Sequence, residues 1–107
     1  MGSELIREAA SHTNDIAGDG TTTATVLTHA MVKSGLKLLE AGYSAQDLCR
    51  GIDVATQKVL GHLKSTAKQL TTSEEIAQVG TISANGDRNI GDLIARAMEK
   101  VGRDGII

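Results

Sequence analysis

The sequence predicts an all-α protein, in which an antiparallel helical hairpin is joined to flanking helices. None of the 107 residues is proline, and proline is the residue that most strongly interrupts a helix. Apolar residues recur at intervals of three and four along most of the chain, which is typical of helices with one buried face. Tyr43 is the sole aromatic residue, so the core must be aliphatic. The length fits one modest domain.

The first three predicted helices precede residue 68. Residues 4–16 have loosely helical apolar spacing and should form the tail of a helix that leads into a glycine-containing loop. A second helix should run over 21–41 and end at Gly42, which can adopt the left-handed conformation. Gly35 inside it is either a close-packing position or a weak point costing about 1 kcal/mol relative to alanine.

Ser44 can cap a third helix that continues to about residue 67. Its apolar residues step by four, three, four and four, and therefore share one face: Leu48, Ile52, Ala55, Val59 and Leu63. Since only a few residues separate the second and third helices, we expect them to pack as an antiparallel hairpin.

Two shorter helices should follow. Thr72 and Glu75 form a capping box for a helix that ends near residue 83. Asp87 can cap a last helix, which carries the most regular apolar stripe and stops at Gly102. Residues 103–107 should form a turn and the first residues of a strand whose partner is missing, so we infer a truncated chain that self-associates through its exposed faces.

Composition argues against several classes of partner. The net charge is −2 with no basic stripe, which disfavours nucleic acid, and no apolar run has the length of a membrane span. Cys49 is the only cysteine, and His12, His29 and His62 lack a metal-ligand spacing. We therefore expect no nucleic-acid or membrane partner and no thiolate metal cluster.

The residues with the clearest chemical potential lie in a loop, at positions 17–25, which read Ala-Gly-Asp-Gly-Thr-Thr-Thr-Ala-Thr. Gly18 and Gly20 allow the backbone to adopt positive φ close to a ligand. The threonines open the second predicted helix, where free N–H groups and the helix dipole favour an anion. Asp19 could supply a carboxylate to Mg²⁺, whose remaining ligands would be phosphate oxygens and water.

An ordinary loop with a threonine or aspartate N-cap explains the same residues without a ligand, and these two interpretations are about equally favoured by local sequence alone. Two functions would follow from them. A structural helical interaction module would leave the loop empty. A small Mg²⁺-dependent phosphate-binding enzyme would need a second carboxylate, for which Asp15 and Asp53 are the candidates.

Two longer strings add a resemblance. Residues 14–27, Asn-Asp-Ile-Ala-Gly-Asp-Gly-Thr-Thr-Thr-Ala-Thr-Val-Leu, resemble the nucleotide-binding segment of group I chaperonins, the GroEL family. Residues 75–85, Glu-Ile-Ala-Gln-Val-Gly-Thr-Ile-Ser-Ala-Asn, and residues 100–107 are similar to the same family in the same order. The resemblance covers the whole chain and only a minor part of a chaperonin subunit.

The resemblance implies an ATP-dependent protein-folding chaperonin subunit with ATP and Mg²⁺ as cofactors. It assigns Asp19 to the metal and to the ATP site, and it assigns the other ATP-binding positions to Gly20, Thr21, Thr22, Thr23, Ile82 and Ser83. No catalytic residue falls in this chain. We expect residues 1–83 to belong to the equatorial ATPase domain and 84–107 to its end and the start of the intermediate domain.

The resemblance also implies partners and a compartment. Family members form homo-oligomeric rings that act on unfolded proteins together with a co-chaperonin. Details at 72–75 and 85–87 favour a mitochondrial matrix protein, with bacterial cytoplasm as the alternative. The isolated chain should hydrolyse ATP negligibly.

Overall fold

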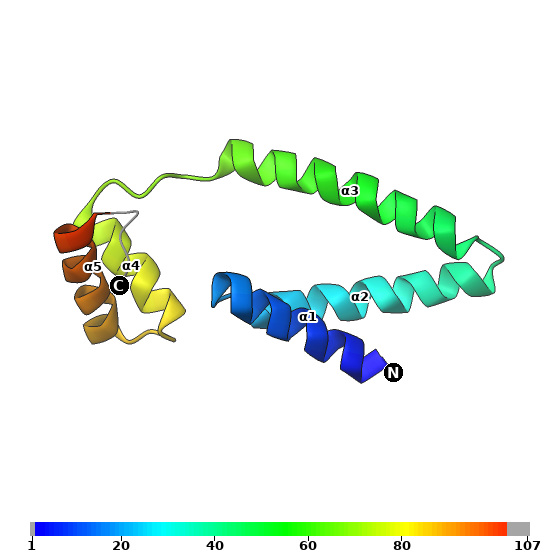
Figure 1. Cartoon of the computed structure of the whole chain (residues 1–107), viewed down its shortest axis with the longest axis horizontal. Helices are drawn as coiled ribbons and strands as arrows, with labels where there is room; N and C mark the ends of the chain where they lie inside the picture. Colours follow the sequence, from blue (N-terminus) through cyan, green and yellow to red (C-terminus); the bar gives the residue numbers. More distant parts are fainter. Residues whose placement is uncertain (1, 103–107) are drawn as a thin grey trace. The chain divides into compact units, whose positions relative to one another are not determined.

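The computed structural model describes residues 2–102, which form five helices (Figure 1). They are α1 (Gly2–Ala17), α2 (Thr21–Glu40), α3 (Ala45–Thr66), α4 (Ser73–Ser83) and α5 (Arg88–Val101). The predicted all-α class is confirmed, and the turn and strand start expected at 103–107 lie outside the described residues. Two compact units divide between Thr66 and Ala67. No helix within 2–102 is long and apolar enough to cross a membrane.

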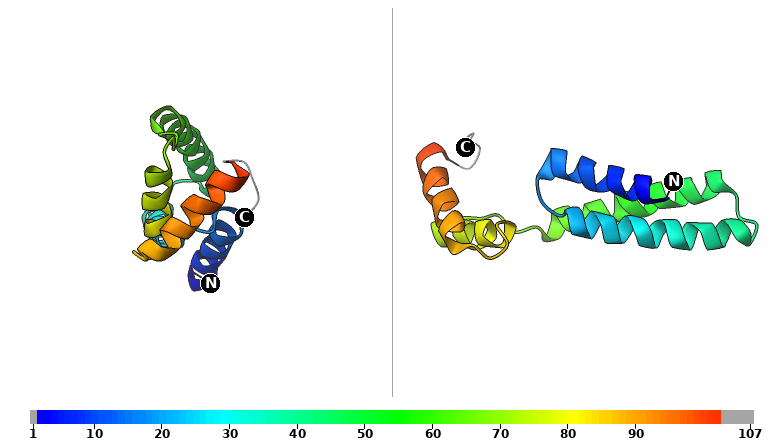
Figure 2. Two further views of the ribbon diagram at one scale, coloured as in Figure 1. Left: turned by 90° about the vertical axis from the view of Figure 1, so that its left-hand side faces the viewer. Right: turned by 90° about the horizontal axis from the view of Figure 1, so that it is seen from below.

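In the first unit, α1 lies alongside α2 and packs against it (Figure 2). The half-buried residues of the two helices are small or β-branched. They are Ile6, Ala9, Ala10 and Thr13 on α1, and Thr21, Ala24, Thr25, Thr28, Val32 and Gly35 on α2. No residue of α1, α2 or α3 is buried. The first unit is therefore a set of long helices with little interior.

The predicted antiparallel hairpin of α2 and α3 forms, but the two helices do not pack against each other along their length. Both helices form at the expected places, but α3 diverges from α2 beyond the turn, and α2 packs on α1 instead (Figure 1). The apolar stripe of α3 stays open, with Ile52 41% and Val59 56% exposed. A short connection places two helices next to each other at one end only, and their packing depends on the angle that the turn imposes.

The turn between α2 and α3 is held by hydrogen bonds on both sides. Gly42 has φ 98°, and the N–H groups of Gly42 and Tyr43 donate to the carbonyls of Leu39 (3.0 Å) and Leu38 (3.1 Å). This pair of bonds is the Schellman motif, which ends a helix at a left-handed residue. Ser44 begins α3, because its carbonyl accepts from Leu48 N (3.0 Å). The predicted end of the second helix and start of the third are both confirmed.

In the second unit, α4 and α5 approach closely enough to bury Ala77, Gly80, Gly91 and Ala95. A Cβ added to Gly91 would meet the side chain of Thr81 and lie 2.5 Å from the carbonyl oxygen of Ala77. A Cβ on Gly80 would lie 3.2 Å from Gly91 Cα. The two glycines therefore allow two helix backbones to touch, which larger residues would prevent.

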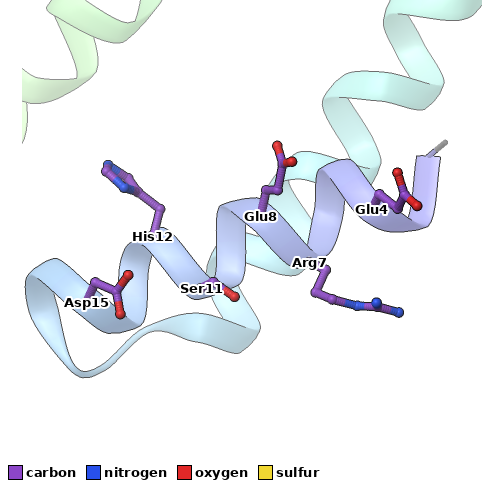
Figure 3. Close-up of a pocket in the computed structure, with 6 residues that line it drawn as sticks. All are labelled: Glu4, Arg7, Glu8, Ser11, His12 and Asp15. Carbon is purple, nitrogen blue, oxygen red and sulfur yellow. The ribbon is translucent and has the colours of Figure 1, made fainter.

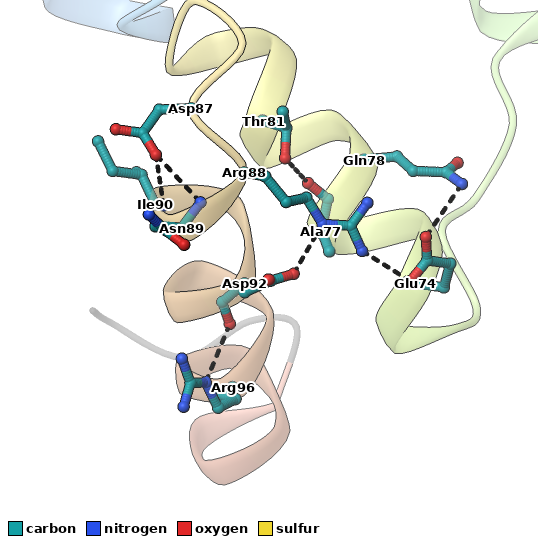
Figure 4. A network of polar contacts seen from close by, with 10 residues as sticks. All are labelled: Glu74, Ala77, Gln78, Thr81, Asp87, Arg88, Asn89, Ile90, Asp92 and Arg96. Carbon is teal, nitrogen blue, oxygen red and sulfur yellow. Dashed lines mark hydrogen bonds and ion pairs between the residues drawn. The ribbon is translucent and has the colours of Figure 1, made fainter.

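Side chains cap both helices of the second unit, as predicted, and Figure 4 shows the cap of α5. Thr72 Oγ1 accepts from Glu75 N (3.1 Å), while the Glu75 carboxylate accepts from Thr71 N (3.3 Å) rather than from Thr72 N. Asp87 Oδ1 accepts from Asn89 N (3.0 Å) and Ile90 N (3.4 Å). Each cap satisfies N–H groups that the first helical turn leaves without a partner.

An ion-pair network joins α4 to α5 at the surface (Figure 4). Arg88 donates from Nη2 to Glu74 (2.9 Å) and from Nε to Asp92 (2.9 Å). The hydrogen bond and the charge of Arg88 lower the pKa of the Glu74 carboxyl group from its usual value, and the two carboxylates raise the pKa of Arg88. Since all three groups are well exposed, water screens much of this attraction.

Candidate functional site

The loop between α1 and α2 has the backbone conformation that its glycines predict. Gly18 and Gly20 have φ of 70° and 82°. Gly18 N donates to the carbonyls of Asn14 (3.0 Å) and Thr13 (3.3 Å), which ties the loop to the last turn of α1. A Cβ on Gly20 would lie 4.0 Å from Thr13 Cγ2, so there is room for it, and the requirement for glycine comes from φ.

The first turn of α2 begins without a side-chain cap. Its N-cap residue is Gly20, in the left-handed conformation, which makes no side-chain capping hydrogen bond. The threonine or aspartate N-cap of the alternative interpretation is therefore absent. Gly20 contributes its carbonyl to Ala24 N (2.9 Å), which starts the helical hydrogen-bonding ladder. An uncapped helix start leaves N–H groups and the positive end of the dipole for water or an anion.

Asp19 is exposed at the outer edge of the loop. Its Oδ1 accepts from the N–H of Gly20 (2.8 Å), which orients the carboxylate next to the start of α2. The neighbouring Thr22 and Thr23 are exposed as well, while Thr21 is half-buried against α1. The structure thus brings together five of the predicted site residues: Asp19, Gly20, Thr21, Thr22 and Thr23.

The two remaining predicted residues belong to the second unit. Ile82 and Ser83 form the last turn of α4, where Ile82 is 76% exposed. Ser83 lines an apolar groove on this unit together with residues of both helices and of the preceding segment: Lys68, Gln69, Leu70, Ile76, Val79, Gly80, Ile94 and Met98. Their assignment to an ATP site stays a prediction.

Sequence reasoning did not single out Thr13, which supports the loop from α1. Thr13 Oγ1 donates to the carbonyl of Ala9 (2.9 Å), and the carbonyl of Thr13 accepts from Gly18 N. Two threonines on α2 behave similarly: Thr25 donates to the Thr21 carbonyl (2.8 Å) and Thr28 to that of Ala24 (2.7 Å). A half-buried threonine that bonds one turn back leaves no distinctive spacing in a sequence.

A shallow polar pocket lies on the face of α1, close to the loop (Figure 3). It is lined by Glu4, Arg7, Glu8, Ser11, His12 and Asp15. Asp15, one candidate for a second carboxylate, lies on this face, whereas Asp53 is exposed on α3. No group of three or more His, Cys, Asp or Glu side chains that could hold a metal occurs in the described part of the chain. A Mg²⁺ at Asp19 would therefore depend on phosphate oxygens and water for most of its ligands.

Comparison with known proteins identifies the family. Residues 2–105 match the TCP-1/cpn60 chaperonin family. The chain belongs to this family. It is 58% identical to "Chaperonin CPN60-2, mitochondrial" of Cucurbita maxima and 59% identical to "Chaperonin CPN60, mitochondrial" of Arabidopsis thaliana, over 107 residues in each case. All of the chain is covered, but only 19% and 18% of those two chaperonins.

The match confirms the chaperonin family that the strings at 14–27 and 75–85 indicate. The chain spans about a fifth of the length of these chaperonin relatives.

Proposed function

We propose that the loop at 18–23 holds the phosphates of ATP and its Mg²⁺ in an ATP-dependent protein-folding chaperonin. One observation carries the proposal: α2 begins at a left-handed glycine without a side-chain cap, directly behind the exposed carboxylate of Asp19. A helix start of this kind attracts anions, and Asp19 adds a hard oxygen ligand for a cation bound to them. Membership of the chaperonin family supports the same assignment.

Each residue of the loop has its own role in this proposal. The backbone N–H groups of Thr21, Thr22 and Thr23, and the exposed hydroxyls of Thr22 and Thr23, donate to phosphate oxygens. The N–H of Gly20 now donates to Asp19, so it must release that bond before it can donate to phosphate. The Mg²⁺ neutralises phosphate charge when it is bound. The assignment of Ile82 and Ser83 to ATP binding rests on the family resemblance alone.

The isolated chain should be able to bind the phosphates of a nucleotide but should hydrolyse ATP negligibly. Phosphoryl transfer depends on several positioned groups that act together, including one that orients the attacking water. The described residues offer Asp19 and the helix start, but no cluster of three metal-ligating side chains. We therefore assign no catalytic residue to this chain, and we propose ATPase activity only for a protein that contains the rest of the site.

We further propose that the segment works in a homo-oligomeric ring in the mitochondrial matrix, on unfolded proteins and with a co-chaperonin. Its relatives from squash and Arabidopsis are named as mitochondrial chaperonins. A domain boundary within residues 84–107, as the resemblance implies, would fall in the helix pair of α4 and α5, which pack against each other. We therefore propose that the equatorial domain passes into the intermediate domain near residues 67–72, between the two compact units.

The test of the loop is Asp19→Ala in a full-length chaperonin that contains this segment, with Asp53→Ala as the matched control. Both aspartates are exposed, but Asp53 lies on α3. We expect Asp19→Ala to weaken Mg²⁺-dependent ADP binding, measured by calorimetry, by about tenfold or more, which is the loss of one charged ligand. Unchanged binding would favour the structural module. Activity of the isolated chain at ring-like rates would instead favour a small phosphate-binding enzyme.

A further inference from the structure

An asparagine stands directly before a glycine in the turn between α4 and α5. Asn85 has φ 56° and Gly86 has φ 90°, and Asn85 is the only residue other than glycine with a positive φ among residues 2–102. The backbone nitrogen of Gly86 can close a five-membered ring on the side-chain carbon Cγ of Asn85. Because glycine has no Cβ, no side chain on Gly86 hinders this ring closure.

The folded turn restrains the nitrogen that would react. Gly86 N donates to the carbonyl of Thr81 (2.8 Å), and Asn85 N donates to the carbonyl of Ile82 (3.1 Å), which together form a Schellman motif. Ring closure needs a Gly86 nitrogen that has lost its proton and has turned toward the Asn85 side chain. Each of these changes breaks the bond to Thr81, so the motif opposes the reaction.

Thr81 connects this turn to the contact between α4 and α5. Figure 4 shows its Oγ1, which donates to the carbonyl of Ala77 (2.7 Å). Its backbone nitrogen and Oγ1 border Gly91, where an added Cβ would meet the Oγ1 and lie 2.8 Å from the nitrogen. The residue whose carbonyl holds Gly86 is therefore fixed by the close approach of the two helices.

We propose that Asn85 is a site of spontaneous deamidation, and that the packing of α4 against α5 sets its rate. Gly86 N gives its proton to solvent and bonds to Asn85 Cγ, while the side-chain amide nitrogen takes up a proton and leaves as ammonia. The product of this step is a succinimide. Water, the only co-reactant, then opens the ring at either carbonyl and yields aspartate or isoaspartate.

The two products should affect the second unit differently. Aspartate tolerates the left-handed conformation, so the turn can form again, although its charge lies at the negative end of the α4 dipole. Isoaspartate adds a methylene group to the main chain, so the spacing between Thr81 and Gly86 no longer fits the motif. A transient opening of the turn is thereby converted into a permanent change at Asn85.

Peptide mass spectrometry tests the proposal on the 107-residue chain, incubated at neutral pH with and without urea. The carboxyl products are heavier than the amide, and chromatography separates aspartate from isoaspartate. We expect Asn85 to react at least about tenfold faster in urea, because the reaction then no longer waits for the turn to open.

The other two asparagines of the chain, Asn14 and Asn89, are internal controls. Each is followed by a residue with a side chain, which hinders ring closure. Both should remain amides over the period in which Asn85 reacts in urea.

A matched pair of variants tests the dependence on helix packing without denaturant. Gly91→Ala crowds Thr81 and should raise the rate at Asn85 about tenfold, since the turn then opens more often. Gly61→Ala should keep the wild-type rate, because a Cβ there would meet nothing within 4 Å. If Gly91→Ala prevents the second unit from folding, its rate should equal the rate in urea.

Three results would overturn the proposal. Equal rates at Asn85 with and without urea would mean that the folded turn gives no protection. A lack of product in urea, or a product without isoaspartate, would exclude the succinimide. Equal rates in the Gly91→Ala and Gly61→Ala chains would mean that helix packing does not set the rate.

Discussion

The two units of the chain differ in how closely their helices approach. The first unit has the three longest helices and most of the large aliphatic side chains, yet none of its described residues is buried. The second unit has two shorter helices and buries Ala77, Gly80, Gly91 and Ala95. Burial in this chain therefore follows the distance between backbones, which small residues set, and not the amount of apolar side chain available.

The largest expected effect comes from closing the glycine contact. Gly91→Ala places a methyl group against Thr81 and the Ala77 carbonyl, which would force α4 and α5 apart. We expect a loss of about 1–3 kcal/mol in the stability of the second unit, the usual cost of overpacking. Amide hydrogen exchange in α4 and α5 measures it, because it resolves each unit separately.

Gly61→Ala is the control for this change, since a Cβ on Gly61 in α3 would meet nothing within 4 Å. Equal amide protection in the Gly91→Ala and wild-type chains would mean that the close approach of α4 and α5 is not required for the stability of the second unit.

A smaller effect is expected at the helix caps. Asp87→Ala removes an acceptor from two N–H groups, and it should cost the second unit about 1 kcal/mol. Ser44→Ala removes one long bond, 3.5 Å from Asp47 N to Oγ, and should change α3 by less than about 0.5 kcal/mol. Protection of the first amides of α5 and α3 compares the two. If Ser44→Ala lowered stability more than Asp87→Ala, the cap in the first unit would be the stronger of the two, contrary to this expectation.

Gly35→Ala should stabilise the first unit. A Cβ at this position would meet nothing within 4 Å, so Gly35 is the weak point of the two alternatives that the sequence leaves open. We expect a gain of about 0.5–1 kcal/mol in α2, because alanine loses less conformational entropy in a helix. The helicity of the chain and the protection of α2 amides should both rise. A loss of stability would show that α1 needs the glycine surface.

The smallest effect is that of pH on the Glu74–Arg88 pair. Because the folded state lowers the pKa of Glu74, the pair stabilises the second unit above the unfolded pKa of about 4.3, and this contribution is lost as pH falls through the lower folded value. Arg88 stays charged over this range. Arg88→Gln should therefore flatten the decline in α4 and α5 protection between about pH 5 and pH 3. Arg50→Gln, at an exposed pair within α3, serves as the control.

Local sequence predicts the helices and their ends well, because caps and left-handed glycines act over a few residues. Thr72, Asp87 and Gly42 all have the roles that their chemistry predicts. The helix starts at Thr21 and Ala45 also agree with expectation to within a residue.

The packing between helices was harder to predict from the sequence. The stripe of α3 predicts a buried face but does not say which helix covers it, and the short turn wrongly suggested α2. The contact of α1 with α2 uses Ala9, Ala24 and Thr28, which are too small and too polar to stand out as an apolar stripe. Similarly, the Gly80–Gly91 approach depends on two residues without side chains.

The sequence predicts the backbone conformation of the loop, but not how the helix that follows it begins. Positive φ at Gly18 and Gly20 follows from their residue type, but the absence of a side-chain cap on α2 does not, because Asp19 and Thr21 are both good caps elsewhere. The support of the loop by Thr13 was missed because a threonine that bonds one turn back leaves no distinctive spacing in the sequence.

Tyr43, 60% exposed in the turn between α2 and α3, is the only aromatic residue of the chain. Its near-ultraviolet absorbance and fluorescence therefore report on one end of the first unit alone. Thermal unfolding followed through tyrosine emission will not register the melting of α4 and α5, whereas far-ultraviolet dichroism will register both. Comparing the two optical signals on one sample would separate the units without any label.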